Sequence, residues 1–229
     1  MSKVLYNPEL MVITVDSDEV RRALGDLQAK TPAVMKVAVN ATAREARRMM
    51  VKSAKKRYDL SRKGIEKIEM LHQRGKATNQ NPTAELYIGG PRNRMRNDLA
   101  YFHTNPSVPY MGTRVFQAPK HFRGRVLKAS PMQDLGGSGT GKSKAFLVKF
   151  TSGHVGMVER QAGTSGPALT QTGKRRWKPN NKLYTLGSAS ARGVHNTVWK
   201  EVEPEVERVL EERLERRIRK VMARAGRST

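Results

Sequence analysis

The stretch PAVMKVAVNATAREARRMMVKSAKKRY, residues 32–58, decides the fold, because a single helix satisfies all of its local signals. The hydroxyl of Thr31 can accept a free backbone N–H, and Pro32 suits the first helical position, where no N–H partner is needed. At about 1.5 Å per residue this helix is about 40 Å long, more than a compact domain of this size needs. We therefore expect part of its length to lie against something else.

The long helix has two contrasting faces. One face is narrow, and its small apolar residues recur at steps of three and four, which indicates packing. These residues are Val39, Ala43, Ala46, Met50 and Ala54. The opposite face is basic, and it is either a solvated helix face or a contact surface for an acidic partner or DNA. It carries Arg44, Arg47, Arg48, Lys52, Lys55, Lys56 and Arg57.

The composition indicates a basic protein with a thin core. Among the 229 residues, Lys and Arg number 44 and Asp and Glu number 20, so the formal net charge is +24. Only 37% of the residues are hydrophobic and 6% are aromatic, which is below the usual share of a globular protein. Self-repulsion works against folding as an isolated monomer at low salt. We therefore expect assembly with partners.

The chain contains no cysteine, which excludes disulfides, thiolate chemistry and the common zinc-binding patterns. A reducing interior suits this composition. The purely apolar stretches span only a few residues each, and the beginning of the chain lacks the basic and apolar regions of a signal peptide. We expect neither a signal peptide nor a contact with a membrane.

The N-terminal region is predicted to contain a strand and two further helices. Residues 10–15 fit a short strand with both faces partly covered. Residues 16–19 offer capping oxygens and negative charge to a first helix, which is predicted to end near Lys30. Ser61 can cap a short helix that continues to Ile68.

The middle of the chain is predicted to consist of strands and loops, because prolines and glycines break it into short pieces. The best hairpin joins strands at 145–150 and 154–159, with Gly153 where a positive φ is wanted. Residues 163–181 are rich in Gly, Thr, Pro and Lys, and are predicted to form a mobile or partner-ordered loop. The other predicted strands span residues 86–88, 114–117, 125–128 and 183–186.

The strongest periodic signal runs from Asn196 to Ala225 and indicates a second long helix. Pro204 interrupts it, so the helix either begins near Glu203 or is kinked. Glutamates come early and arginines late, which matches the helix dipole. The apolar stripes of the two long helices form the candidate oligomer or packing interface. It consists of Val39, Ala43, Ala46, Met50, Val206, Leu210, Leu214 and Ile218.

Residues 136–143, GGSGTGKS, fit the P-loop pattern GxxxxGK[ST], in which backbone N–H groups surround phosphates at the start of a helix. The neighbouring sequence does not suit a nucleotide site. A P-loop follows a buried strand and opens a helix, whereas SPMQD precedes this segment and the strand-like AFLVKF follows it. We expect a flexible loop between strands.

The sequence has no pattern typical of an active site. Its five histidines are far apart and show no HxH or HxxxH spacing, so it offers no support for metal binding. No Ser, His and Asp arrangement has a recognisable nucleophile elbow, and the adjacent Glu211 and Glu212 are expected on a solvated helix face. We therefore expect a protein without enzymatic activity, cofactor or metal.

An aromatic residue lies inside a cationic run, which consists of Lys174, Arg175, Arg176, Trp177 and Lys178. Such a run can bind a phosphate backbone while the indole stacks on a base or a sugar. It can equally dock onto an acidic protein surface. No nucleic-acid-binding fold signature accompanies the run, so nonspecific contact with DNA stays open and sequence-specific recognition is not expected.

Three patterns follow one another over most of the chain. An Ala- and Arg-rich helix runs into Tyr58, a hairpin carries FTSGHVG at residues 150–156 and ends in Arg160, and Leu183-Tyr184 with a Gly-Ser turn precedes the closing charged helix. In this order the patterns resemble the minor tail protein Z family, the tail-completion proteins of long-tailed bacteriophages. None of the motifs is catalytic.

The resemblance implies a structural virion protein at the head-proximal end of the tail, the neck, without enzymatic activity. It implies a homo-oligomeric ring, expected to be a hexamer, in contact with other phage tail or neck proteins. The host cytoplasm would be the site of assembly. The alternative function is that of a nonspecific nucleic-acid-binding protein.

Together the predicted elements favour an α+β fold in a single domain, residues 1–229. Long helices near both ends are expected to pack on a mostly antiparallel sheet from the middle of the chain, with long loops. The strand and helices of residues 1–60 come first, the sheet and loops of residues 61–190 follow, and residues 191–229 form the last helix.

Overall fold

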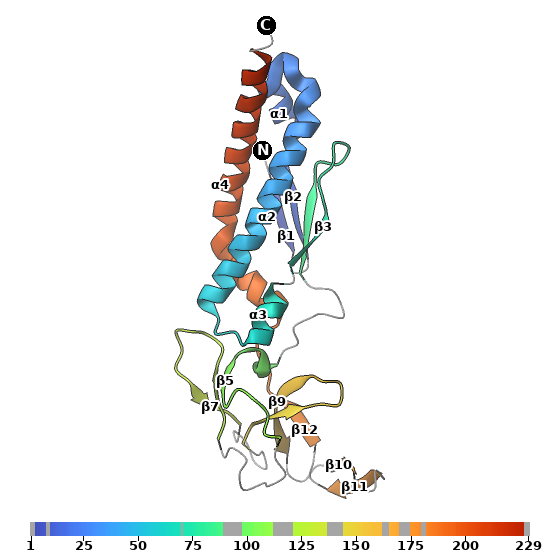
Figure 1. Ribbon diagram of the computed structural model, residues 1–229, viewed down its shortest axis with the longest axis vertical. Helices are drawn as coiled ribbons and strands as arrows, with labels where there is room; N and C mark the ends of the chain where they lie inside the picture. The colour runs from blue at the N-terminus through green and yellow to red at the C-terminus, as the bar shows by residue number, and fades with distance from the viewer. Residues whose placement is uncertain are drawn as a thin grey trace. The chain divides into compact units, whose positions relative to one another are not determined.

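The α+β fold with long helices near both ends is confirmed by a computed structural model (Figure 1). The structure describes residues 3–7, 10–69, 71–88, 98–111, 121–136, 144–161, 165–169, 175–179 and 182–226. It divides into two compact units, which we call the terminal unit and the central unit by their place in the sequence. The terminal unit comprises Met1–Ala54, Lys67–Arg94 and Ala191–Thr229, and the central unit comprises Lys55–Glu66 and Met95–Ser190.

The terminal unit contains both long helices and a four-stranded sheet. The helices are α1 (Ser17–Leu24), the 3-10 helix η1 (Gly25–Lys30), α2 (Thr31–Arg57) and α4 (Ala191–Ala225), with α2 ending in the central unit. The strands are β1 (Lys3–Asn7), β2 (Leu10–Thr14), β3 (Leu71–Gly75) and β4 (Ala84–Ile88), in the antiparallel order β1-β2-β4-β3. The short helix α3 (Arg62–Ile68) contributes residues to both units.

One face of the four-stranded sheet is buried because alternate side chains of a strand point to the same side. Ile13 lies between Val4 and Ala84 in the antiparallel register, and Met11 is paired with Leu86. All five side chains are buried. The predicted strands at 10–15 and 86–88 are therefore confirmed as β2 and β4. Strands β1 and β3 were not predicted, because each is short and carries few regularly spaced apolar residues.

Helix α2 matches the predicted helix to within one residue at each end. Its small-residue face, from Val39 to Ala54, is completely buried. Helix α4 runs antiparallel beside it (Figure 1), since Ser53 Oγ donates a hydrogen bond to Glu201 Oε2 at 2.9 Å and Glu45 lies 3.7 Å from Arg213. Small side chains let neighbouring backbones approach closely, so this face suits tight packing in the core.

Helix α4 begins at Ala191, five residues before the predicted start, and passes through Pro204 without ending. The predicted alternative of a helix that begins near Glu203 is therefore wrong. The first turns have a buried face of their own, with Val194, Val198 and Trp199. Their packing outweighs the hydrogen bond that proline cannot make.

The first predicted helix is shorter than expected. Helix α1 ends at Leu24, and a 3-10 helix continues to Lys30. Gly25 adopts a φ of 52°, a conformation that readily ends a helix and that glycine tolerates. The predicted capping of the start is confirmed, since Asp16 accepts a hydrogen bond from the Asp18 N–H at 2.9 Å.

The central unit consists of small antiparallel sheets. Their orders are β5-β6-β7, β12-β9-β8 and β10-β11. The strands are β5 (His103–Asn105), β6 (Arg123–Arg125), β7 (Gln133–Asp134), β8 (Phe146–Lys149), β9 (Val155–Gln161), β10 (Ser165–Leu169), β11 (Arg175–Pro179) and β12 (Lys182–Thr185). A short 3-10 helix, η2 (Leu99–Tyr101), precedes β5. The middle of the chain thus forms three small sheets.

Several predictions for the middle of the chain were right and two were wrong. The hairpin around Gly153, at a φ of 79°, and the strand at 183–186 are confirmed as β8–β9 and β12. The strand predicted at 125–128 instead ends at Arg125, where the chain turns. The loop predicted at 163–181 contains β10 and β11, paired through backbone groups that the Gly- and Pro-rich composition did not reveal. The strand predicted at 114–117 lies outside the described residues.

His195 of α4 is a buried titratable group in the terminal unit. Its Nε2–H donates to the Ile68 carbonyl at 3.2 Å. Burial lowers the pKa of His195 to about 4, although the hydrogen bond opposes this shift. A charged imidazole is unfavourable in an apolar surrounding, so the folded protein keeps His195 neutral.

This burial predicts a loss of stability in mild acid. Unfolded histidine titrates near pH 6.5, so the unfolded chain binds a proton first as the pH falls from about 6.5 towards 4. Between about pH 8 and pH 5, His195 should remove about 2 kcal/mol from the free energy of unfolding. Urea unfolding at both pH values should show this loss in the wild type and in the control His121→Gln, which alters an exposed histidine. The loss should be smaller by that amount in His195→Gln, and equal pH dependence in all three proteins would contradict the explanation.

Candidate functional site

The carboxylate of Asp98, which is buried at the start of η2, links several parts of the central unit. Asp98 Oδ1 accepts hydrogen bonds from the Ala100 N–H at 2.9 Å and the Met157 N–H at 3.0 Å. Asp98 Oδ2 lies 2.8 Å from His154 Nε2. One carboxylate therefore joins η2 to the β8–β9 hairpin, and its burial is compensated by these bonds.

The FTSGHVG segment of the hairpin is shaped around this carboxylate. The rings of Phe150 and His154 stack with centroids 5.9 Å apart, and the Phe150 N–H donates to the His154 carbonyl at 2.8 Å. A Cβ atom on Gly156 would lie 2.9 Å from Asp98 Oδ2 and 3.0 Å from Phe150 Cε2. The residues of the motif thus build a turn and its anchor.

A second ionic cluster centres on Asp59. Its carboxylate forms an ion pair with Arg125 and lies 3.1 Å from His103 Nδ1. Burial alone would raise the pKa of Asp59, but the hydrogen bond and charge of Arg125, helped by His103, hold that pKa below its usual value. The cluster therefore joins Asp59 to His103 of β5 and to Arg125 of β6.

The predicted packing residues of the two long helices lie in the core of the terminal unit. Val39, Ala43, Ala46, Met50, Val206, Leu210 and Leu214 are buried within the chain itself, and Ile218 is half-buried. Most of this candidate interface is therefore used for packing inside the chain. Ile218 and the exposed flanks of α4 are left for contact with a partner.

The predicted basic residues belong to both units. Arg44, Arg47, Arg48, Lys52 and Lys56 are exposed, and Lys55 is half-buried. Arg47 donates to the Glu69 carbonyl at 3.0 Å, and Arg48 lies 3.3 Å from Glu45. In the cationic run, Arg175 to Lys178 belong to β11, and Lys174 lies outside the described residues.

Two grooves flank α4 in the terminal unit and have opposite charge. The acidic groove, with a volume of about 420 Å³, lies between α1 and α4. It is lined by Glu19, Val20, Ala23, Glu207, Glu211, Leu214, Glu215 and Ile218. The basic groove, of about 220 Å³, lies between α2 and α4. It is lined by Val37, Ala38, Ala41, Arg213, Arg216, Arg217 and Lys220.

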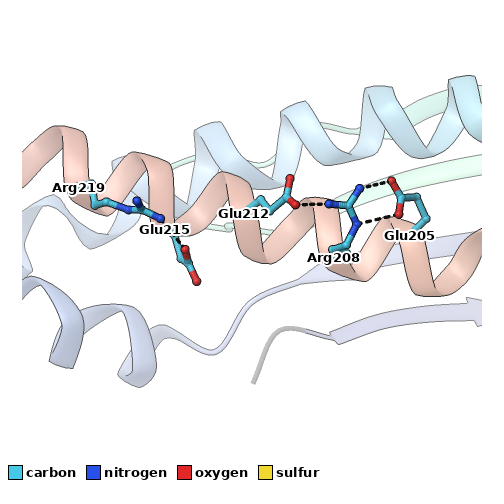
Figure 2. Close-up of polar contacts among 5 residues, drawn as sticks. All are labelled: Glu205, Arg208, Glu212, Glu215 and Arg219. Atoms are coloured by element: carbon cyan, nitrogen blue, oxygen red, sulfur yellow. Dashed lines mark hydrogen bonds and ion pairs between the residues drawn. The ribbon is translucent and has the colours of Figure 1, made fainter.

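A third face of α4 carries charges that are paired with one another (Figure 2). Arg208 bonds both to Glu205 and to Glu212, which lie about two helical turns apart, and the bond from Arg208 lowers the pKa of Glu205. Arg219 lies 2.7 Å from Glu215. This face therefore satisfies most of its own charge, and Glu215 belongs both to it and to the lining of the acidic groove.

The glycine-rich segment at 136–143 lies between two paired residues. Gly136 and Lys144 form an antiparallel bridge, and β8 follows at Phe146. Residues 137–143 themselves lie outside the described residues. A P-loop needs a helix directly after its glycines, whereas this segment leads into the predicted strand.

The described residues contain no group of three or more His, Cys, Asp or Glu side chains that could hold a metal ion. Within the same part of the chain, no helix is both long and apolar enough to cross a membrane. Asp98 was not singled out from the sequence, where its position before Leu99-Ala100-Tyr101 offered only a weak capping signal.

The anchor predicts a graded response to glycine substitution. Gly156→Ala should cost about 2 kcal/mol, because the new methyl group meets a carboxylate that three hydrogen-bond donors hold in place. Gly153→Ala has space but keeps a positive φ, so it should cost about 1 kcal/mol. The control Gly187→Ala has neither constraint and should stay within about 0.5 kcal/mol. Urea unfolding monitored by circular dichroism measures the three values, and an equal effect of all three would contradict the anchor.

No protein-family model, curated protein or solved structure matches the chain. The candidate site is therefore defined by the molecule's own features, which are the Asp98 anchor, the exposed basic face of α2 and the two oppositely charged grooves along α4.

Proposed function

We propose that this chain is a structural virion protein that completes a bacteriophage tail at its head-proximal end. It acts there as a ring of identical copies in contact with other tail or neck proteins. The observation that carries the proposal is the structural role of the residues that resemble the minor tail protein Z family. These residues stabilise the fold, and none of them is arranged for catalysis.

Two parts of the resemblance, Tyr58 and the hairpin, have a structural reason in the central unit. Tyr58 is buried and its ring lies 6.3 Å from that of Phe102. Gly153 closes the hairpin turn, and His154 and Gly156 fit the Asp98 carboxylate. A structural protein acts through its shape, so the residues that characterise it are expected to be those that the fold requires. This supports a structural role over a catalytic one.

The terminal unit supports assembly. Its apolar stripes are used inside the chain, so contacts with neighbours depend on the exposed flanks of α4 and on the charged faces. Groups of like charge on such surfaces direct association and fix its register. The exposed basic face of α2 suits an acidic protein partner in the neck or nonspecific contact with DNA.

Deletion of the gene from the phage genome that encodes the chain tests the function directly. We expect heads and tails that form but do not join, because the tail end that contacts the head is incomplete. Electron microscopy measures the joining, and quantitative mass spectrometry of wild-type particles should find the chain in a fixed copy number. Complementation with the wild-type gene is the control. Normal infection by particles without the chain would overturn the proposal.

The exposed basic face of α2 is the one observation that favours the alternative function, nonspecific nucleic-acid binding. As a tail protein, the chain should bind DNA only weakly, independently of sequence and with strong salt sensitivity. Replacing Arg44, Arg48 and Lys52 with Gln should reduce the slope of log affinity against log salt by about 0.9 for each phosphate that the protein no longer neutralises.

A matched control replaces Arg21, Arg22 and Lys30, which are also exposed but lie outside α2, with Gln. This control should leave the slope nearly unchanged. Filter binding or fluorescence anisotropy over a range of salt concentrations measures both variants. Nanomolar DNA binding in physiological salt, together with a deletion that does not affect infection, would replace the structural function with nucleic-acid binding.

A further inference from the structure

We propose that the acidic groove of one copy of this chain docks onto the basic groove of the next copy, so that α4 forms the contact on both sides. The inference rests on the proposed ring and names its interface. The partner is therefore a second copy of this chain. Opposite charges around the small apolar base of each groove hold the two copies together.

The first argument is the separation of charge around α4. At about 3.6 residues per turn, Glu207 and Glu211 lie roughly 140–180° around the helix from Arg216 and Lys220. The buried stripe of Val206 and its neighbours lies between these two flanks. Each copy thus presents an acidic and a basic surface on nearly opposite sides of one helix.

The second argument is that two acids of the groove lack internal compensation. Glu207 and Glu211 are four residues apart on the same face, where like charges repel each other. Neither carboxylate has an ion-pair partner among the described residues. The face shown in Figure 2 pairs its acids with Arg208 and Arg219 instead. Glu207 and Glu211 are therefore available to cations from outside the chain.

The third argument is that both grooves combine charge with an apolar floor. Val20 and Leu214 are buried below the acidic groove, and Ile218 is half-buried beside them. Ala38 and Ala41 form part of the basic groove. The grooves also lie at overlapping levels of α4, since both include residues between Arg213 and Ile218. Two copies can therefore meet side by side.

Complementary patches on opposite sides produce a head-to-tail contact. Such a contact is heterologous: each copy uses one surface towards one neighbour and a different surface towards the other. It generates a ring if the rotation between copies closes, and an open filament if it does not. The chain carries a net charge of +24, so basic surfaces are common on it and acidic grooves are scarce. The acidic groove is therefore the less common half of the contact.

Charge reversal in the purified full-length chain tests the interface. The acidic-groove variant is Glu207→Lys with Glu211→Lys, and the basic-groove variant is Arg216→Glu with Lys220→Glu. Each places like charges opposite each other, so each should weaken self-association on the order of a hundredfold by analytical ultracentrifugation. Combining all four substitutions, or mixing the two variants, should restore association because opposite charges meet again.

Matched controls change the net charge equally at exposed residues outside both grooves. Glu205→Lys with Glu212→Lys matches the acidic-groove variant, and Arg208→Glu with Lys30→Glu matches the basic-groove variant. Both controls should associate like the wild type. Circular dichroism should show folded protein in every sample, and rescue by the combined variant excludes loss of folding as the cause.

The outcomes separate this inference from the proposed function. A wild-type chain that assembles but ignores both groove reversals would overturn the interface and leave the structural role intact. Reversals that weaken association without rescue in the mixture would also overturn the pairing of the two grooves. A wild-type chain that stays monomeric both in solution and in particles would overturn the ring itself, and the interface with it.

Discussion

The packing of α2 alongside α4 is the interaction on which the terminal unit depends. The chain has few hydrophobic residues for its length, and many of the buried ones in this unit belong to these two helices. Ala43, Ala46 and Ala54 contribute little area each, but their small side chains let neighbouring backbones approach closely. The sheet face with Met11 and Ile13 completes this core. The charged residues therefore lie on the surface, where acidic and basic residues can be grouped separately.

This separation of acidic from basic residues links the fold to the proposed role. A helix buried along one stripe has two flanks and an outer face, and α4 uses each differently. The outer face neutralises itself through Arg208 and Arg219, whereas the flanks are acidic towards α1 and basic towards α2. The central unit contributes a different kind of order, because Asp98 anchors a hairpin through specific hydrogen bonds.

The sequence predicted what is periodic and missed what depends on distant partners. Helix α2 was placed to within one residue because its spacing is local, and Gly153 marked its hairpin for the same reason. Strands β10 and β11 were missed because pairing is a property of two segments, which composition does not describe. Asp98 was missed because His154 and Met157 lie more than fifty residues away. The acidic groove could not be predicted either, since it needs the position of α1 beside α4.

Helix α4 is a wall of both grooves, and this has a mechanical consequence. A small sideways shift of α4 from α1 towards α2 would widen the acidic groove while narrowing the basic groove, because the two lie on opposite flanks. Occupation of one groove would then change the fit at the other. In the ring that we propose, addition of a copy on one side would therefore affect binding on the other side of the same subunit. Because α2 packs along α4, it limits how far α4 can move.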